Sequence, residues 1–98
     1  MERSEPEPKS GTRFDPTSFV ALVTGLGAQA QILLGAIDNP VTKKKEPVDL
    51  ERARGVIGLL EMLADKTHGN LTPDETGFLE RILADLRMRW VEAKSAAG

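Results

Sequence analysis

Residues 16–37 read PTSFVALVTGLGAQAQILLGAI, a run of helical length without one charged side chain. Charged residues make up 29% of the whole chain, so this segment stands apart from its surroundings. Its apolar residues recur at helical spacing and occupy two opposite faces. A chain of 98 residues has little surface with which to cover both faces. We therefore expect a helix that is completed by self-association or by another protein.

A membrane span is the first alternative, because about 20 apolar residues can cross a bilayer. The middle of the run, however, contains Thr24, Gln29 and Gln31 together with glycines. Polar amides are poorly tolerated in a bilayer unless they pair with another helix. We therefore expect a buried helix of a bundle and no membrane partner.

Capping residues predict the ends of this first helix. Asp15 provides an N-cap oxygen, and Pro16 occupies the first helical position, where its missing N–H has no cost. At the other end, Pro40 pushes the residue before it out of the helical region. The pattern predicts a helix over residues 16–38.

Two further helices are predicted by apolar residues at intervals of three and four. The second spans residues 50–68, with Asp49 as its N-cap and Gly69 in a left-handed conformation at its C′ position. The third spans residues 73–94 and begins with a capping box. The fold class is therefore all-α, a three-helix module completed by homo-oligomerisation. The predicted core stripes of these two helices are Leu50, Ala53, Val56, Ile57, Leu60, Leu63 and Ala64, and Phe78, Leu79, Ile82, Leu83, Leu86, Trp90 and Ala93.

Composition divides the chain into three parts. Residues 1–13 are charged and proline-containing and cannot bury enough apolar surface to offset their ordering entropy, so we expect a disordered tail. Residues 14–94 form the helical domain, and residues 95–98 are expected to fray. The chain has no cysteine, so we expect no disulfides. Its N-terminus lacks an apolar signal segment, so we expect a cytoplasmic protein.

The first helix has a bulky face and a small face. The bulky face is expected to join the core through Phe19, Leu22, Val23, Leu26, Ala30, Leu33 and Ile37. A row of small residues lets two helix backbones approach closely. We therefore expect a symmetric subunit interface on the small face, with docking of a different protein or a merely exposed face as alternatives. The predicted interface comprises Ala21, Gly25, Ala28, Ile32 and Gly35, flanked by Thr24 and Gln31.

A glycine motif in the same helix resembles a dinucleotide-binding fingerprint. Residues 25–30, GLGAQA, match G-x-G-x-x-A. That fingerprint requires a preceding strand, a second parallel strand and an acidic residue about 20 positions later. Asp38 comes too early and Pro40 interrupts the pattern. We expect no nucleotide site.

The remaining polar residues do not assemble a catalytic or metal site. His68 is the only histidine, and its place beside a helix C-terminus suits interaction with the last carbonyls. Glu61 and Asp65 share one helix face, but two carboxylates make a poor metal site. We therefore expect no enzyme, no cofactor and no bound metal.

Basic residues suggest a second kind of partner. Lys43–Lys45 form a basic loop, for which simple solvation is favoured over contact with an anion or nucleic acid. A second candidate surface comprises Arg87, Arg89 and Trp90, although the place of Trp90 on the apolar stripe favours core packing. The net charge of −2 argues against nucleic acid as the partner, since phosphate neutralisation dominates such binding. The alternative function is regulatory binding of an anionic partner, nucleic acid or acidic protein, through Lys43–Lys45 and the arginines of the third helix.

Several short motifs occur in the order and spacing of a known family. The chain resembles the small bacterial proteins catalogued as domain of unknown function 1844, from about Phe14 to Glu92. The resemblance implies a bacterial, cytoplasmic helical protein and brings no activity, cofactor or catalytic residue with it. We expect a non-enzymatic interaction module or structural subunit that self-associates, as a homodimer or higher oligomer. The matching residues are Gly27-Ala28-Gln29-Ala30, Leu34-Gly35, Asn39-Pro40, Asp49-Leu50 with Ala53, Lys66-Thr67 with Gly69-Asn70-Leu71-Thr72, and Leu86-Arg87 with Trp90.

Overall fold

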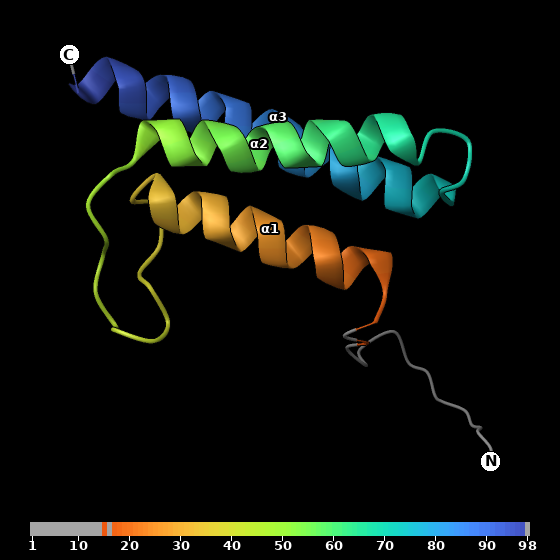
Figure 1. The fold of residues 1–98 in the computed structure, drawn as a ribbon, viewed down its shortest axis with the longest axis horizontal. Helices are drawn as coiled ribbons and strands as arrows, with labels where there is room; N and C mark the ends of the chain where they lie inside the picture. The colour runs from red at the N-terminus through yellow and green to blue at the C-terminus, as the bar shows by residue number, and fades with distance from the viewer. Residues whose placement is uncertain (1–14, 16, 98) are drawn as a thin grey trace.

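The computed structural model describes residue 15 and residues 17–97, and this part of the chain contains three helices and no strand. The helices are α1 (Phe19–Leu33), α2 (Leu50–Lys66) and α3 (Pro73–Ala97) (Figure 1). The predicted all-α, three-helix fold is confirmed. The expectations for the tail 1–13 and for Pro16 concern residues outside the described part.

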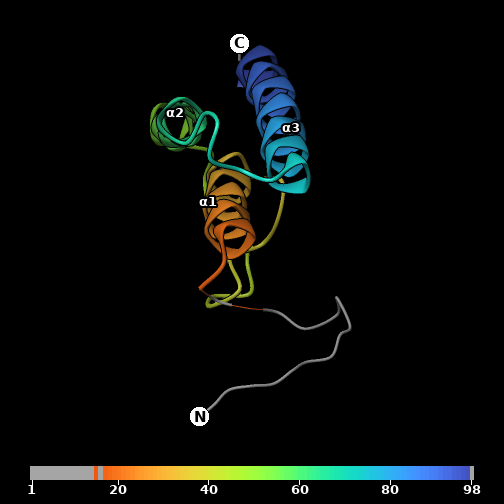
Figure 2. The ribbon, with the colours of Figure 1, turned by 90° about the vertical axis from the view of Figure 1, so that its right-hand side faces the viewer.

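The three helices pack as a triangular bundle in which every pair is in contact. Successive helices run antiparallel, and the end-on view of Figure 2 shows α1 below the pair formed by α2 and α3. The apolar stripes of all three helices meet along the bundle axis. The buried core comprises Val23, Ala30, Leu33, Leu34, Ala53, Val56, Ile57, Leu60, Leu79, Leu83 and Leu86.

The second and third helices begin where their capping residues predict. The Asp49 carboxylate accepts a hydrogen bond from the Arg52 N–H (3.0 Å). The Thr72 hydroxyl accepts from the Glu75 N–H (3.1 Å), while the Glu75 carboxylate accepts from the Thr72 N–H (2.9 Å). These reciprocal bonds form the predicted capping box and satisfy N–H groups that a helix start leaves free. Only the far ends differ, because α2 stops two residues earlier than predicted and α3 continues to Ala97.

The start of α1 was predicted incorrectly. Ser18 is its N-cap, and the Ser18 hydroxyl accepts a hydrogen bond from the Ala21 N–H (3.1 Å). Asp15 instead accepts hydrogen bonds from the N–H (2.9 Å) and hydroxyl (2.6 Å) of Thr17. These bonds lower the pKa of the Asp15 carboxyl below its usual value. Asp15 therefore closes a turn before the helix, and α1 begins three residues later than predicted.

The end of α1 differs further, because the helix stops at Leu33 and does not reach residue 38. Gly35 has φ +75°, in the left-handed region that favours glycine. The Gly35 N–H donates to the Ile32 carbonyl (3.0 Å) and the Ala36 N–H to the Gln31 carbonyl (2.8 Å). This pair of bonds is the Schellman arrangement that ends a helix. Gly35 is thus a helix-stopping residue and does not belong to a row along α1.

The buried face of α1 is also rotated from the predicted one. Leu22 and Ile37 were expected in the core but lie at the surface, while Gly27 and Leu34 are buried in their place. A Cβ placed on Gly27 would lie 3.3 Å from Ile82 Cγ2 of α3. The absence of a side chain at Gly27 lets α1 approach α3 closely, and this approach turns Leu22 outward.

The turn between α2 and α3 contains a second left-handed glycine. Gly69 has φ +85°, as predicted, but Thr67 is the C-cap of α2, so Gly69 is two residues beyond the cap and does not occupy the C′ position. The Asn70 N–H donates to the Thr67 carbonyl (2.8 Å) across this turn. Leu71 then packs against the core, which anchors the start of α3.

Candidate interaction surfaces

The outer face of α1 retains most of the predicted small-residue row. Ala21, Gly25, Ala28 and Ile32 follow one another at intervals of four, three and four. Gly25 is exposed, and a Cβ placed on it would meet no atom within 4 Å. The backbone of α1 is therefore open to close approach from outside. Thr24, which is exposed, and Gln31, which is partly exposed, flank this row.

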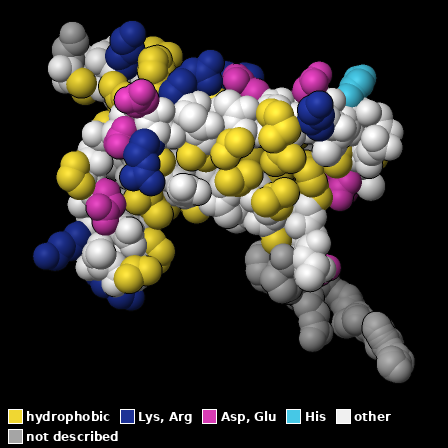
Figure 3. Space-filling model, in the orientation of Figure 1, with side chains coloured by type: hydrophobic (Ala, Val, Ile, Leu, Met, Phe, Trp, Pro, Cys, Tyr) yellow, Lys and Arg dark blue, Asp and Glu magenta, His cyan; other side chains and the backbone are white. Residues whose placement is uncertain are grey.

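Large apolar side chains lie exposed beside this row, on the turns where α1 and α2 face each other. Leu22 of α1 is 49% exposed, and Leu59 and Met62 of α2 are 48% and 44% exposed. Figure 3 shows hydrophobic side chains gathered across the middle of the molecule, over α2 and α1. The sequence did not reveal this patch, because Leu22 was assigned to the core. We call the surface formed by Ala21, Leu22, Gly25, Ala28, Leu59 and Met62 the α1/α2 face.

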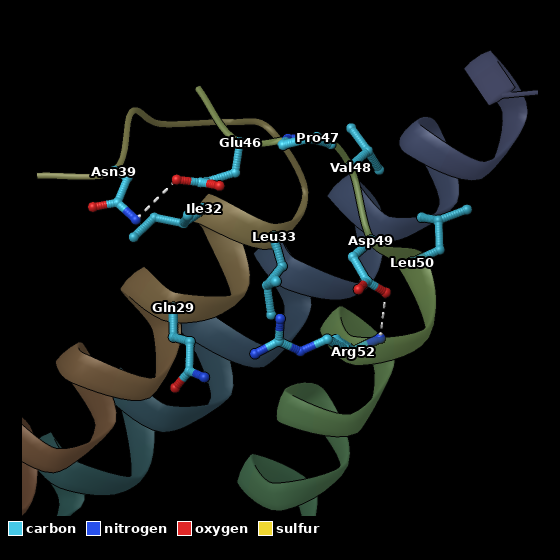
Figure 4. Close-up of a pocket in the computed structure, with 10 residues that line it drawn as sticks. All are labelled: Gln29, Ile32, Leu33, Asn39, Glu46, Pro47, Val48, Asp49, Leu50 and Arg52. Carbon is cyan, nitrogen blue, oxygen red and sulfur yellow. Dashed lines mark hydrogen bonds between the residues drawn. The ribbon is translucent and has the colours of Figure 1, made fainter. Parts of the chain in front are cut away.

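The α1/α2 face ends in an open pocket of about 690 Å³ (Figure 4). Two hydrogen bonds hold its walls together, one from Asn39 Nδ2 to Glu46 Oε2 (3.1 Å) and one from the Asp49 N–H to the Leu33 carbonyl (2.8 Å). The second bond ties the start of α2 to the end of α1. The pocket is lined by Gln29, Ile32, Leu33, Asn39, Glu46, Pro47, Val48, Asp49, Leu50 and Arg52.

The polar groups of this pocket come from α1, from α2 and from the connection between them. Figure 4 shows Arg52 extending from α2 toward Gln29 on α1. Glu46 is engaged by Asn39, and the Asp49 carboxylate caps α2. The pocket therefore presents one guanidinium, two amides and two carboxylates.

A second hollow, of about 160 Å³, lies between α2 and α3 beside Trp90. Arg87 donates to Glu61 Oε2 through Nε (3.1 Å) and Nη2 (2.8 Å), and Arg54 Nη1 lies 3.4 Å from Glu61 Oε1. The hydrogen bonds from Arg87, with a smaller contribution from Arg54, hold the pKa of Glu61 below its usual value. We call this hollow the Trp90 slot; it is lined by Arg54, Ile57, Glu61, Arg87, Trp90 and Val91.

Trp90 is both a core residue and a wall of the slot. Its ring packs against the core, as the apolar stripe predicts. The indole Nε1–H donates a hydrogen bond to the Leu50 carbonyl at the start of α2 (2.9 Å). Trp90 is partly exposed, and Lys94 Nζ lies over its ring, 5.4 Å from the ring centroid.

The structure divides the predicted surface of Arg87, Arg89 and Trp90. Arg87 and Trp90 line the Trp90 slot, but Arg89 points elsewhere and donates to Asp85 Oδ2 (2.8 Å). The bond to Asp85 raises the pKa of the Arg89 guanidinium. Arg89 lines a different hollow with Leu34 of the α1 end, so only two of the three residues act together.

The lysine loop is separate from the arginines of α3. Lys43–Lys45 are exposed in the connection between α1 and α2, where Lys45 Nζ lies 3.5 Å from Asp38 Oδ1. Figures 1 and 2 show this connection below α1, whereas the C-terminal half of α3 lies above it. One basic surface that combines both groups is not formed.

The described residues bring together no cluster of metal ligands. Within residues 15 and 17–97, no three His, Asp or Glu side chains gather as a metal site requires. His68 is exposed in the turn after α2. None of the three described helices is both long and apolar enough to serve as a membrane span.

Comparison with known proteins assigns the chain to a family. The family model described as Domain of unknown function (DUF1844) matches residues 16–92. No curated protein and no solved structure matches the chain. Because the matched segment covers most of the sequence, the chain belongs to the DUF1844 family.

Proposed function

We propose that this DUF1844 protein is a non-enzymatic interaction subunit that self-associates through its α1/α2 face. The observation that carries the proposal is the exposure of Leu22, Leu59 and Met62 on neighbouring helices. Grouped apolar side chains at a surface mark interaction sites, because burying them removes apolar area from water. The same face continues into the pocket beside Arg52.

A second copy of this chain is the partner that suits the face best. α1 has no charged residue between Phe19 and Leu33, so two copies can bring these helices together without like-charge repulsion, although each chain has a net charge of −2. A two-fold dimer pairs the same patch on both subunits. The open space above Gly25 then lets the two α1 backbones cross closely.

The proposal also gives the uncharged α1 segment a role in water. Its outer face is covered by protein in the dimer, and its inner face by α2 and α3. We propose the cytoplasm as the place of this assembly.

Sedimentation equilibrium of three forms of the full chain tests the proposal. The wild-type protein is expected to have twice the chain mass at micromolar concentrations. Gly25→Gln should shift the mass toward that of one chain, because the new side chain holds the helices apart. Gly77→Gln is the matched control: Gly77 is also inside a helix, where a Cβ would meet only the end of the Arg81 side chain at 3.7 Å, but that helix is α3, which takes no part in the α1/α2 face.

Circular dichroism of the same variants separates assembly from folding. Both substitutions replace glycine by a better helix former, so neither should reduce the helicity of the monomer. A wild-type mass of one chain would overturn the proposal. A Gly25→Gln dimer as strong as the wild-type dimer would also overturn it, since assembly would then use another surface.

A further inference from the structure

The Trp90 slot is a second surface, with chemistry different from that of the α1/α2 face. We propose that the Trp90 slot binds an acidic peptide segment of a partner protein, anchored by one large apolar side chain. The proposal rests on the shape and the charges of the slot and does not depend on self-association.

The slot is shaped to receive a single apolar side chain. Its volume of about 160 Å³ is small, and Ile57 is buried between α2 and α3 at its base. Val91 is 57% exposed on one side, and the partly exposed Trp90 ring forms another wall. Tryptophan and arginine beside an apolar hollow are the residues that most often dominate binding energy at protein interfaces.

The charges around the slot favour carboxylates. Arg54 and Arg87 are each 55% exposed and share the single carboxylate of Glu61. Lys94 adds a third cation beside the indole ring. Arg54 and Arg87 thus share one carboxylate and Lys94 lies over the ring that walls the slot, although the whole chain has a net charge of −2. Guanidinium groups bind carboxylates in a two-pronged geometry, so Arg54 and Arg87 can each take a partner carboxylate.

An acidic peptide fits these features better than a nucleic acid does. Nucleic-acid affinity needs many phosphate contacts along an extended basic surface. The structure separates Lys43–Lys45 from the slot, and Arg89 is paired with Asp85. The remaining cations are Arg54, Arg87 and Lys94, which form a compact basic cluster around the Trp90 slot. That arrangement matches a short acidic segment with a leucine or a phenylalanine among its carboxylates.

The Glu61 carboxylate competes with a bound acidic segment for the arginines of the slot. In the free protein, Glu61 Oε2 lies 2.8 Å from Arg87 Nη2, and Glu61 Oε1 lies 3.4 Å from Arg54 Nη1. A bound acidic segment has to displace at least part of this contact. Removing the negative charge of Glu61 should therefore strengthen binding, whereas removing a cation of the slot should weaken it.

Intrinsic fluorescence provides a direct test, because Trp90 is the only tryptophan of the chain and tyrosine is absent. The probe is the blocked peptide acetyl-Glu-Glu-Leu-Glu-Glu-amide, titrated into the full chain. We expect a saturable change in Trp90 emission that weakens as salt is added. The control peptides replace the leucine by alanine or the four glutamates by lysines, and both should bind about tenfold more weakly or not at all.

Charge variants then locate the binding site. The double variant Arg54→Gln, Lys94→Gln should weaken binding of the probe about tenfold, and Glu61→Gln should strengthen it severalfold. Arg81→Gln is the matched control, because Arg81 lies over the Phe78 ring, away from the slot, and its loss should leave affinity unchanged. Gly25→Gln should also bind the probe as the wild-type chain does, which separates this test from the test of self-association.

Four outcomes would overturn the proposal. The first is the absence of a saturable change with the acidic peptide. The second is an equal loss of affinity in Arg81→Gln, which would indicate a general charge effect. The third is tighter binding of a single-stranded oligonucleotide in the same assay. The fourth is a change of Trp90 emission with protein concentration alone, which would make the slot a contact between copies of this chain.

Discussion

Gly27 of α1 faces Ile82 of α3 so closely that a Cβ on Gly27 would lie 3.3 Å from Ile82 Cγ2. The close helix approach that the glycines of α1 indicate is therefore made inside the chain at Gly27. The neighbouring Gly25 points outward into open space. Two glycines separated by one residue thus belong to different surfaces, and their substitutions should have different effects.

Gly27→Leu is expected to destabilise the fold. A leucine at this buried site collides with Ile82 and forces α1 away from α3, and such overpacking costs about 1–3 kcal/mol. Urea unfolding followed by circular dichroism measures the loss. Gly25→Leu is the control, and it should unfold no more easily than the wild-type monomer because its Cβ meets open space. Equal effects at the two sites would contradict the orientation of α1.

The two left-handed glycines should respond unequally to alanine. Gly69→Ala should cost about 1 kcal/mol, because φ +85° is strained for alanine but no atom lies within 4 Å of the new Cβ. Gly35→Ala should cost about 2 kcal/mol, since its φ of +75° is combined with a 3.1 Å contact to Val48 Cγ2.

Val48→Ala supplies the control for this pair in thermal or urea unfolding. In the Gly35→Ala background, Val48→Ala should recover part of the lost free energy of unfolding, because it removes the methyl group that crowds the new Cβ. It should recover nothing in the Gly69→Ala background. Identical costs at both glycines, with no rescue by Val48→Ala, would indicate that the turn after α1 is built differently.

Stability should depend on pH through Glu61. Hydrogen bonds from Arg87 and Arg54 hold its pKa below the reference value of 4.5, so the folded protein favours the ionised form. This contribution is present at pH values above 4.5 and is lost as the pH falls through the lowered pKa of the folded state. The stability difference between wild type and Glu61→Gln should therefore be present at pH 7 and shrink in acid.

Thermal unfolding of both forms across this pH range measures the effect. Salt should reduce the difference at pH 7, because the arginine side chains are exposed. A difference that is independent of pH would show that the two arginines do not stabilise the charge of Glu61. An NMR titration of the Glu61 side chain then reports the pKa of that carboxyl directly.

The sequence predicted the parts of the fold that local chemistry specifies. Asp49 and the capping box before α3 were identified because side-chain caps act within three residues. The core stripes of α2 and α3 were identified because a single apolar face leaves one way to pack. These features need no knowledge of the neighbouring helices.

The rotation of α1 was not predictable in the same way. Its two apolar faces allow more than one orientation, and the choice depends on Gly27 meeting Ile82, a contact between residues far apart in the chain. Gly35 was misassigned because a glycine can end a helix or permit close packing, and periodicity alone does not distinguish the two. The apolar patch beside Leu22 follows from that orientation, so the sequence did not reveal it.

The Trp90 slot was also predicted only in part from the sequence. Trp90 and Arg87 were identified as a candidate surface from residue type alone. The slot depends on Glu61, which joins Arg87 across the two helices at a separation of 26 residues. Arg89 was included because it is next to Trp90 in sequence, although it points to another side of α3.

In the proposed dimer, α1 meets its own copy across the outer face that contains Gly25. The chain has no cysteine, so one introduced cysteine is a clean probe. We propose oxidation of three single variants, Ala21→Cys, Gly25→Cys and Ala28→Cys, with Gly77→Cys on α3 as the control. A disulfide requires Cα atoms within about 7 Å, which only residues near the two-fold axis reach.

The measurement is the fraction of covalent dimer on non-reducing gels after mild oxidation at micromolar concentration. We expect rapid crosslinking at one or more of Ala21, Gly25 and Ala28, and slow crosslinking at Gly77. Crosslinking at Gly77 that is as fast as at all three α1 sites, or no crosslinking at any α1 site, would rule out this contact between α1 helices.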